Sequence, residues 1–173
     1  MRVDLDVRNE SRHKRLYRTD VLKRCAQRIC EGEGVADDVE LSVLFCDDPF
    51  IRELNREYRS IDRPTDVLSF EQEAAQSVHP RPLGDIVISL DTVHAHCAGD
   101  RALMREEVNL LFCHGLLHLL GYDHQTAEQR RKMQQKQSHY LGTTPENAWR
   151  FGPRTNADSG PNARRRSKPS LGR

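Results

Sequence analysis

Apolar residues in the first ninety positions gather in short stretches that have the character of β-strands. In residues 2–8, Val3, Leu5 and Val7 alternate with charged residues, as in a strand with one buried face. Three more stretches are short, rich in apolar residues and bounded by turn residues: 39–45, 65–70 and 86–90. The pattern therefore predicts four strands.

Five other segments are predicted to be helices. They cover residues 19–31, 47–58, 91–98, 103–120 and 126–141. The first carries Leu22, Cys25 and Ile29 at helical spacing, and the second has Pro49 in its first turn. Strands and helices are mixed along the chain, which predicts an α+β fold. We expect a single domain, residues 1–150, with a small mixed four-stranded sheet packed with about five helices.

Two segments lack such periodicity. Residues 71–82 are polar and contain Pro80 and Pro82, so we expect a loop there. Residues 151–173 consist largely of Pro, Gly, Ser, Asn and Arg, and are predicted to form a disordered, basic C-terminal tail.

Composition narrows the class of protein. The 173 residues are 36% apolar and 31% charged. No run approaches the roughly 18 apolar residues that span a bilayer, so we expect no membrane association. The first residues include acids and no continuous apolar stretch, unlike a secretory signal or a transit peptide, which favours the cytoplasm. Five cysteines without a Cys-x-x-Cys pair are expected to be isolated, buried thiols.

Charge is distributed unevenly along the chain. The segment 153–173 holds six basic residues and one acid, a net charge of +5. The remainder, residues 1–152, holds 21 basic and 25 acidic residues, a net charge of −4. A general nucleic-acid-binding protein usually has a basic body. Any contact with RNA must therefore come from a local basic patch or from the tail.

Three histidines provide the strongest chemical signal. His114 and His118 are four residues apart in a helical segment, so their side chains lie about one turn apart on one face. Gly121 is expected to end the helix and let the chain turn back, which brings His124 toward the same point. Three imidazoles without a fourth protein ligand are typical of catalytic zinc. The spacing predicts a metal site, most readily for Zn²⁺, at the end of a central helix.

Gly115 limits the chemistry of this site. Zinc peptidases with the His-Glu-x-x-His pattern carry their general base directly after the first histidine. This chain has Gly115 at that position. The ligand spacing is that of a peptidase, but the base is missing, which argues against peptide hydrolysis by that mechanism.

The histidine block and three upstream blocks together resemble a known family. The blocks are residues 54–59 (Leu-Asn-Arg-Glu-Tyr-Arg), 65–70 (Thr-Asp-Val-Leu-Ser-Phe), 83–86 (Leu-Gly-Asp-Ile) and 114–124 (His-Gly-Leu-Leu-His-Leu-Leu-Gly-Tyr-Asp-His). In them the chain is similar to the YbeY family of bacterial rRNA maturation factors, described as zinc-dependent endoribonucleases. The likeness extends over about residues 38–142.

The resemblance implies a function. It implies one Zn²⁺ on His114, His118 and His124, with Arg59 and His114 as catalytic residues. The expected activity is that of a single-strand-specific endoribonuclease that processes the 3′ end of 16S rRNA and acts in ribosome quality control. The expected partners are rRNA and the small ribosomal subunit, together with ribosomal proteins or assembly factors. Nothing carries over to the tail, which lies outside the family blocks.

Further residues are candidates for supporting roles. Four arginines recur every three or four residues and would form one basic stripe that binds RNA: Arg52, Arg56, Arg59 and Arg63. Glu53 and Glu57 dilute the stripe, so a solvated surface is the alternative. Asp85, at a strand edge, is a candidate for orienting an imidazole, whereas Asp66 is expected to serve in a turn or cap.

Two other functions remain open from the sequence. The first is a ribosome-assembly factor in which zinc is structural, favoured by the negative body and by the lack of an obvious general base. The second is a metallohydrolase of another substrate, against which Gly115 weighs if that substrate is a peptide.

Overall fold

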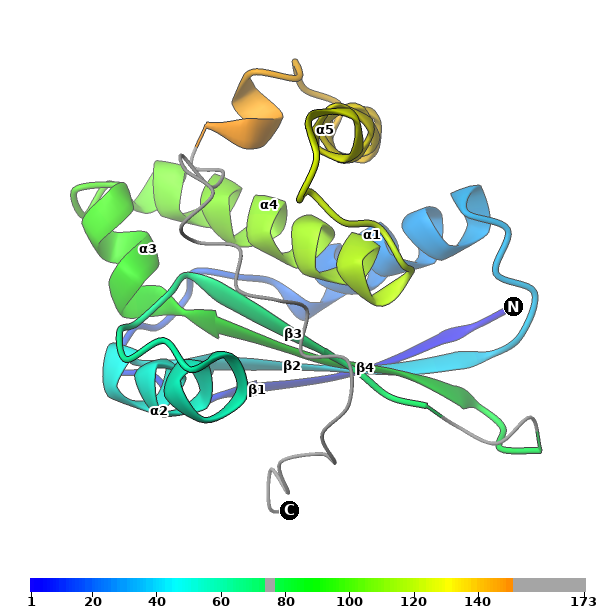
Figure 1. Cartoon of the computed structure of the whole chain (residues 1–173), viewed down its shortest axis with the longest axis horizontal. Helices are drawn as coiled ribbons and strands as arrows, with labels where there is room; N and C mark the ends of the chain where they lie inside the picture. Colours follow the sequence, from blue (N-terminus) through cyan, green and yellow to red (C-terminus); the bar gives the residue numbers. More distant parts are fainter. Residues whose placement is uncertain (74–76, 151–173) are drawn as a thin grey trace.

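Four strands form one mixed sheet in the computed structural model, which describes residues 1–73 and 77–150. The strands are β1 (Val3–Asn9), β2 (Val39–Cys46), β3 (Val67–Glu71) and β4 (Arg81–Ser89), in the order β1-β2-β4-β3. β1, β2 and β4 run parallel, and β3 runs antiparallel to β4 at one edge. The expected α+β fold with a mixed four-stranded sheet is confirmed (Figure 1).

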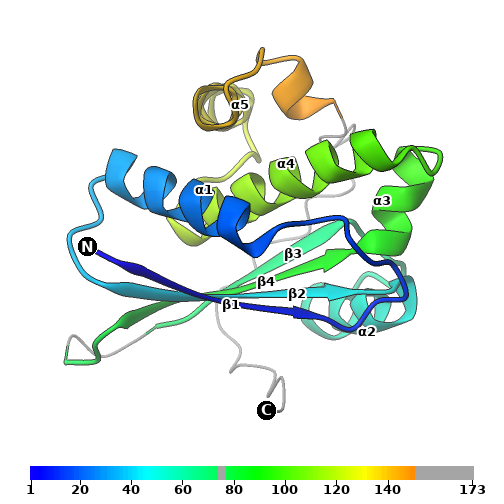
Figure 2. The same cartoon turned by 180° about the vertical axis from the view of Figure 1, so that it is seen from behind.

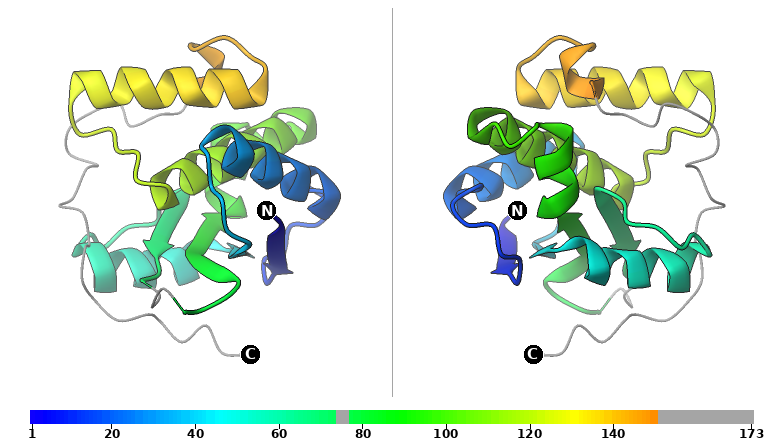
Figure 3. Two further views of the ribbon diagram at one scale, coloured as in Figure 1. Left: turned by 90° about the vertical axis from the view of Figure 1, so that its right-hand side faces the viewer. Right: turned by 90° about the vertical axis from the view of Figure 1, so that its left-hand side faces the viewer.

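Helices cover both faces of the sheet. They are α1 (Thr19–Gly32), α2 (Asp48–Arg59), α3 (Leu90–His96), α4 (Arg101–Leu119) and α5 (Ala127–Leu141), followed by the short 3₁₀ helix η1 (Asn147–Trp149). α1 and α4 lie on one face of the sheet (Figure 2). α2 lies on the other face, and α5 lies outside α4, away from the sheet (Figure 3). No helix within the described ranges combines the length and apolar content needed to cross a membrane.

The alternation of side chains along β2 divides the core in two. Val43 and Phe45 point into the main cluster beneath α1 and α4, whereas Leu44 and Cys46 point into a smaller cluster beneath α2. From Glu107 onward, α4 is enclosed by the sheet, α1 and α5, and most of its side chains there are buried and apolar. The polar groups on that part of α4 are therefore largely held away from bulk water. All five cysteines are buried and unpaired, as expected.

The structure differs from the predicted elements in two places. First, β4 begins at Arg81, inside the segment expected to be a loop. Pro82 is tolerated because pairing with β3 starts only at Gly84, so at Pro82 the described part of β4 has a single neighbouring strand. The second difference is η1, which carries no apolar periodicity that would have predicted it. The predicted disorder of residues 151–173 lies outside the described residues.

Gly115 marks the closest approach of α4 to the sheet. A Cβ atom built on it would lie 3.0 Å from both Ile86 Cγ2 and Ser69 Oγ. Ser69 Oγ also donates a hydrogen bond to the Gly115 carbonyl oxygen, at 3.2 Å. A side chain at this position would force Ile86 or Ser69 to shift, and a side chain as large as glutamate would need much more space. The close packing therefore gives a structural reason for glycine where zinc peptidases carry glutamate.

Replacing Gly115→Glu is expected to destabilise the protein by at least about 3 kcal/mol, because it overpacks the core and buries a carboxylate. Urea denaturation followed by circular dichroism measures the loss. Ala102→Glu adds the same side chain at an exposed position of α4 and serves as the control, with little expected change. Equal unfolding midpoints for the two variants would show that the space around Gly115 is not limiting.

Candidate metal centre

The three histidines converge at the C-terminal end of α4. His114 and His118 lie on its last two turns, and Gly121, with φ +96°, turns the chain back toward them. The ring centroids are 4.6 Å apart for His114 and His118, 5.3 Å for His114 and His124, and 4.9 Å for His118 and His124. Each ring offers one nitrogen to a group whose ligand atoms all lie within 4.8 Å of one another.

The surroundings keep these imidazoles neutral. Burial, reinforced by the other two histidines, holds the pKa of His114 well below its usual value. Burial lowers the pKa of His118 to about 4, with a further contribution from His124. The pKa of His124 is also lowered, again mainly by burial. A neutral imidazole has a lone pair to donate, so all three rings are in the form that binds a metal ion at neutral pH.

The geometry fits a tetrahedral cation with an open position. The Nε2 atoms of His114 and His118 are 3.1 Å apart, close to the roughly 3.3 Å expected when both bind one Zn²⁺ at about 2.0–2.1 Å. His124 Nδ1 is buried and has no hydrogen-bond partner in the described part of the chain. No fourth His, Cys or carboxylate of the described residues joins the group. This is the donor set of a catalytic site rather than of a closed structural one.

A glutamine sets the orientation of His114. Gln137, fully buried on α5, accepts a hydrogen bond from His114 Nδ1 through its Oε1 atom, at 2.8 Å. Its Nε2 atom donates to the Ala148 carbonyl oxygen in η1, at 2.7 Å. With the proton on Nδ1, the Nε2 lone pair of His114 faces the other histidines. The Trp149 ring closes this side, 5.5 Å from His114 and 5.8 Å from His124 between centroids.

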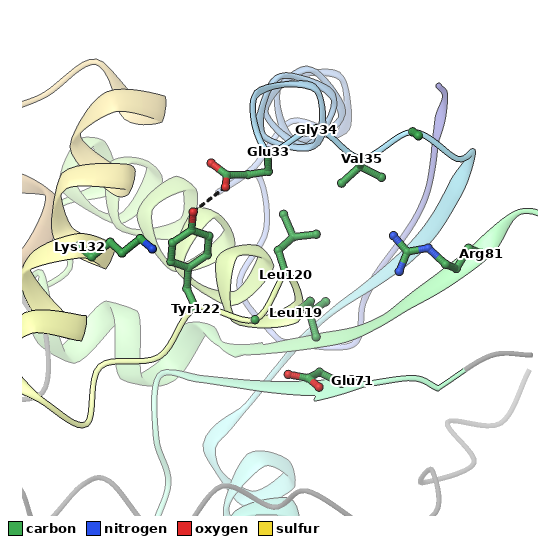
Figure 4. Close-up of a pocket in the computed structure, with 11 residues that line it drawn as sticks. Glu33, Gly34, Val35, Glu71, Arg81, Leu119, Leu120, Tyr122 and Lys132 are labelled. Carbon is green, nitrogen blue, oxygen red and sulfur yellow. Dashed lines mark hydrogen bonds between the residues drawn. The ribbon is translucent and has the colours of Figure 1, made fainter. Parts of the chain in front are cut away.

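A separate network fixes the turn that delivers His124. Glu33, just after α1, accepts hydrogen bonds from Tyr122 at 2.6 Å, Tyr140 at 2.5 Å and Lys136 at 2.8 Å. Figure 4 shows the contact between Tyr122 and Glu33 at the edge of a neighbouring pocket of about 720 Å³. None of the three histidines lines that pocket. The network therefore supports the centre from outside by tying its turn to α1 and α5.

The charge of Arg59 influences the pKa of each of the three histidines. Arg59 ends α2 and is only partly exposed, and its charge helps to lower each of these pKa values. Burial lowers its own pKa, and the charges of Asp66 and Asp123 oppose that shift. Within the described residues, no carboxylate lies at salt-bridge distance from Arg59. Its positive charge therefore acts on the imidazoles without being held in an ion pair by any described carboxylate.

The other arginines of the expected stripe are engaged elsewhere. Arg52 forms a two-point ion pair with Asp62, at 2.9 and 3.2 Å, and Arg56 pairs with Glu53 at 2.5 Å. Arg63 is exposed. Such surface pairs are weak and can exchange for phosphate, so they neither establish nor exclude RNA contacts.

The aspartates differ from one another. Asp85 accepts hydrogen bonds from Ser42 and Gln72, and the hydrogen-bond partner of His114 is Gln137, not Asp85. Asp123 accepts a hydrogen bond from the backbone N–H of His124 at 2.7 Å and so shapes the turn.

The sequence did not predict three residues that support the centre: Gln137, Trp149 and Glu33. A glutamine in a polar helix and residues around an irregular segment carry no periodic or motif signal.

The fold and the histidine centre together define a class: small α+β proteins that carry a group of three histidines able to hold a metal ion at the end of a buried helix. The model of the family described as Endoribonuclease YbeY matches residues 6–144. The chain belongs to this family.

Individual relatives agree with this assignment. A protein named Endoribonuclease YbeY from Pelotomaculum thermopropionicum is 41% identical over 128 residues, which cover 72% of this chain and 84% of that protein. One of the same name from Bacillus cytotoxicus is 37% identical over 150 residues, 82% of this chain and 96% of its own. The solution structure of TM1509 from Thermotoga maritima matches with a TM-score of 0.55 at 28% identity, covering 92% of this chain and 99% of that one.

Replacing Gln137→Ala is expected to weaken Zn²⁺ binding about 10–100-fold, because His114 loses the acceptor that fixes its tautomer. Competition with a chromophoric chelator measures the affinity. Gln134→Ala is the matched control, since Gln134 lies on the same helix and donates to the Pro145 carbonyl oxygen without touching a histidine. Equal losses in the two variants would assign Gln137 a general structural role.

Proposed function

We propose that this protein is a metal-dependent endoribonuclease that cleaves single-stranded RNA in the maturation of ribosomal RNA. The observation that carries the proposal is the juxtaposition of three neutral imidazoles, one open coordination position and the partly buried Arg59, which no described carboxylate holds in an ion pair. His114, His118 and His124 would hold Zn²⁺, which supplies Lewis acidity toward a phosphoryl oxygen. Three neutral ligands leave the full charge of the ion available for that task.

Arg59 is proposed to bind the scissile phosphate. A guanidinium can donate two parallel hydrogen bonds to phosphate oxygens, and it offsets negative charge that develops during cleavage. Its partial burial strengthens that interaction relative to an arginine in water. His114, oriented by its hydrogen bond to Gln137, would act on the same phosphate from the metal centre. Arg59 and His114 are therefore the residues that we propose as catalytic.

RNA is favoured over peptide as the substrate for two reasons. The relatives at 37–41% identity carry the name endoribonuclease. Gly115 supplies no general base and leaves little room for one in the place where zinc peptidases carry it. Metal-loaded protein that hydrolysed peptides, and lost this on His118→Ala, would favour the metallohydrolase alternative instead.

The biological setting is proposed on family membership. We propose the 3′ end of 16S rRNA as the substrate, the cytoplasm as the location, and ribosome quality control as a further role. Because residues 1–152 are net negative, long-range attraction to RNA is weak. Binding would then depend on Arg59, on contacts by Arg52, Arg56 and Arg63, and on presentation of the RNA by the small ribosomal subunit and its proteins or assembly factors.

Replacing Arg59→Ala or His114→Ala is expected to slow cleavage of precursor 16S rRNA on the order of 10²–10³-fold, because each removes a group that acts on the reacting phosphate. Gel analysis of end-labelled precursor, incubated with metal-quantified protein and ribosomal subunits, measures the rate. Arg24→Ala is the control, since Arg24 is an exposed arginine of α1 paired with Asp20, outside the proposed RNA-binding stripe, and it should change the rate less than about threefold. If Arg59→Ala and His114→Ala both cut as fast as the wild type, the mechanism is wrong.

A second candidate is a ribosome-assembly factor with a structural metal, favoured by the negative body and by the absence of a carboxylate from the three-histidine group in the described residues. Removing the metal distinguishes the two. The core beneath α1 and α4 is formed without the histidines, so for the enzyme we expect chelation to abolish cleavage and leave the far-UV circular dichroism unchanged. Unfolding on chelation would favour the assembly factor.

A further inference from the structure

A second group of possible metal ligands lies near the opposite end of α4. Asp66 comes directly before β3, His96 is the last residue of α3, and Glu107 lies in the second turn of α4. One ligand atom from each lies within 4.8 Å of those of the other two. Figure 1 shows why these residues meet: α3 leads from the end of β4 to the start of α4, beside the start of β3.

Glu107 lacks the contacts that a buried carboxylate requires. Its side chain has 0% exposure, and neither oxygen has a hydrogen-bond partner in the described part of the chain. Arg150 forms an ion pair with this side chain, with its Nε atom 3.7 Å from Glu107 Oε2, which is longer than a hydrogen bond. Arg150 also pairs with the exposed Glu106, at 3.2 Å. A carboxylate in this state is costly unless another positive charge reaches it.

Asp66 adds a second negative charge to the same place. Its Oδ1 atom accepts the N–H of Val67 at 2.8 Å, which fulfils the expected turn role and fixes the direction of the carboxylate. Burial raises the pKa of Asp66, and burial together with Asp66 raises the pKa of Glu107 to about 8. Two carboxylates so close together require either a bound proton or a cation between them.

We propose that Asp66, His96 and Glu107 form a second divalent-cation site. Two carboxylate oxygens suit a hard divalent ion, and an imidazole nitrogen favours a transition ion over Mg²⁺ or Ca²⁺, so Mn²⁺ is the ion chosen to represent this class. His96 is exposed, so an ion can enter from solvent and reach the buried carboxylates. The ion would bind Glu107 directly, whereas Arg150 reaches this carboxylate only through an ion pair of 3.7 Å.

This site is separate from the histidine centre. Glu107 precedes His114 by seven residues on α4, which is about 10 Å along the helix axis. Two ions that act on one phosphate lie only about 3.5–4 Å apart. The second ion is therefore not part of a two-metal catalytic centre, and the proposal does not depend on the proposed RNA cleavage.

Electron paramagnetic resonance of Mn²⁺ tests the proposal on the full chain. The protein is stripped with a chelator, loaded with equimolar Zn²⁺, which three imidazoles prefer to hold, and titrated with Mn²⁺. Wild-type protein is expected to bind one Mn²⁺ per chain, and Glu107→Gln, of nearly identical shape, is expected to bind none. Glu106→Gln is the matched control: it removes the charge of the neighbouring, exposed glutamate and should still bind one.

Two further variants make the result decisive. Asp66→Asn should abolish Mn²⁺ binding in the same way, which covers the case in which Glu107→Gln does not fold. His118→Ala should weaken Zn²⁺ binding and leave the Mn²⁺ signal intact, which separates this site from the histidine centre. If wild-type protein binds no Mn²⁺, or if Glu107→Gln and Asp66→Asn both still bind it, the proposal is overturned, whatever the outcome of the cleavage assay.

Discussion

From Glu107 onward, helix α4 is enclosed by the sheet beneath it, α1 beside it and α5 outside it, and this enclosure governs the chemistry of the protein. Side chains on that part of the helix are mostly apolar, and a polar side chain there loses much of its hydration. His114 and His118 respond by remaining neutral, because burial lowers the pKa of both. Glu107 on the same helix is also buried, but for a carboxylate burial raises the pKa instead of lowering it. One physical cause therefore prepares both ends of α4 to receive positive charge.

The same enclosure separates this site from a peptidase with the same ligand spacing. The approach of α4 to β3 and β4 leaves little space at Gly115, so a side chain as large as glutamate would have to displace Ile86 or Ser69. The positive charge that acts beside the histidines comes instead from α2, through Arg59, and the orientation of His114 comes from α5, through Gln137. The centre thus depends on elements from both faces of the sheet, although its three histidines lie within one short segment of the sequence.

Much of this arrangement could be predicted from the sequence. The helix that carries His114 and His118, the turn at Gly121 and the mixed four-stranded sheet all follow from local patterns of few residues. The start of β4 could not, because Pro82 is acceptable only where the strand has a single neighbour, which is a property of the sheet and not of the segment. Gln137 and Glu107 were missed for a related reason. Each is an ordinary helical residue until tertiary packing removes its water.

The hydrogen bonds from His114 through Gln137 to the Ala148 carbonyl oxygen have a consequence for the order in which the molecule matures. A ribosome makes the three imidazoles first and the carbonyl that fixes them later, and a domain folds as a unit only once its parts have been synthesised. During synthesis, the imidazoles can therefore meet before their geometry is locked. His114 can take its final orientation only after η1 has been synthesised and has docked on α5.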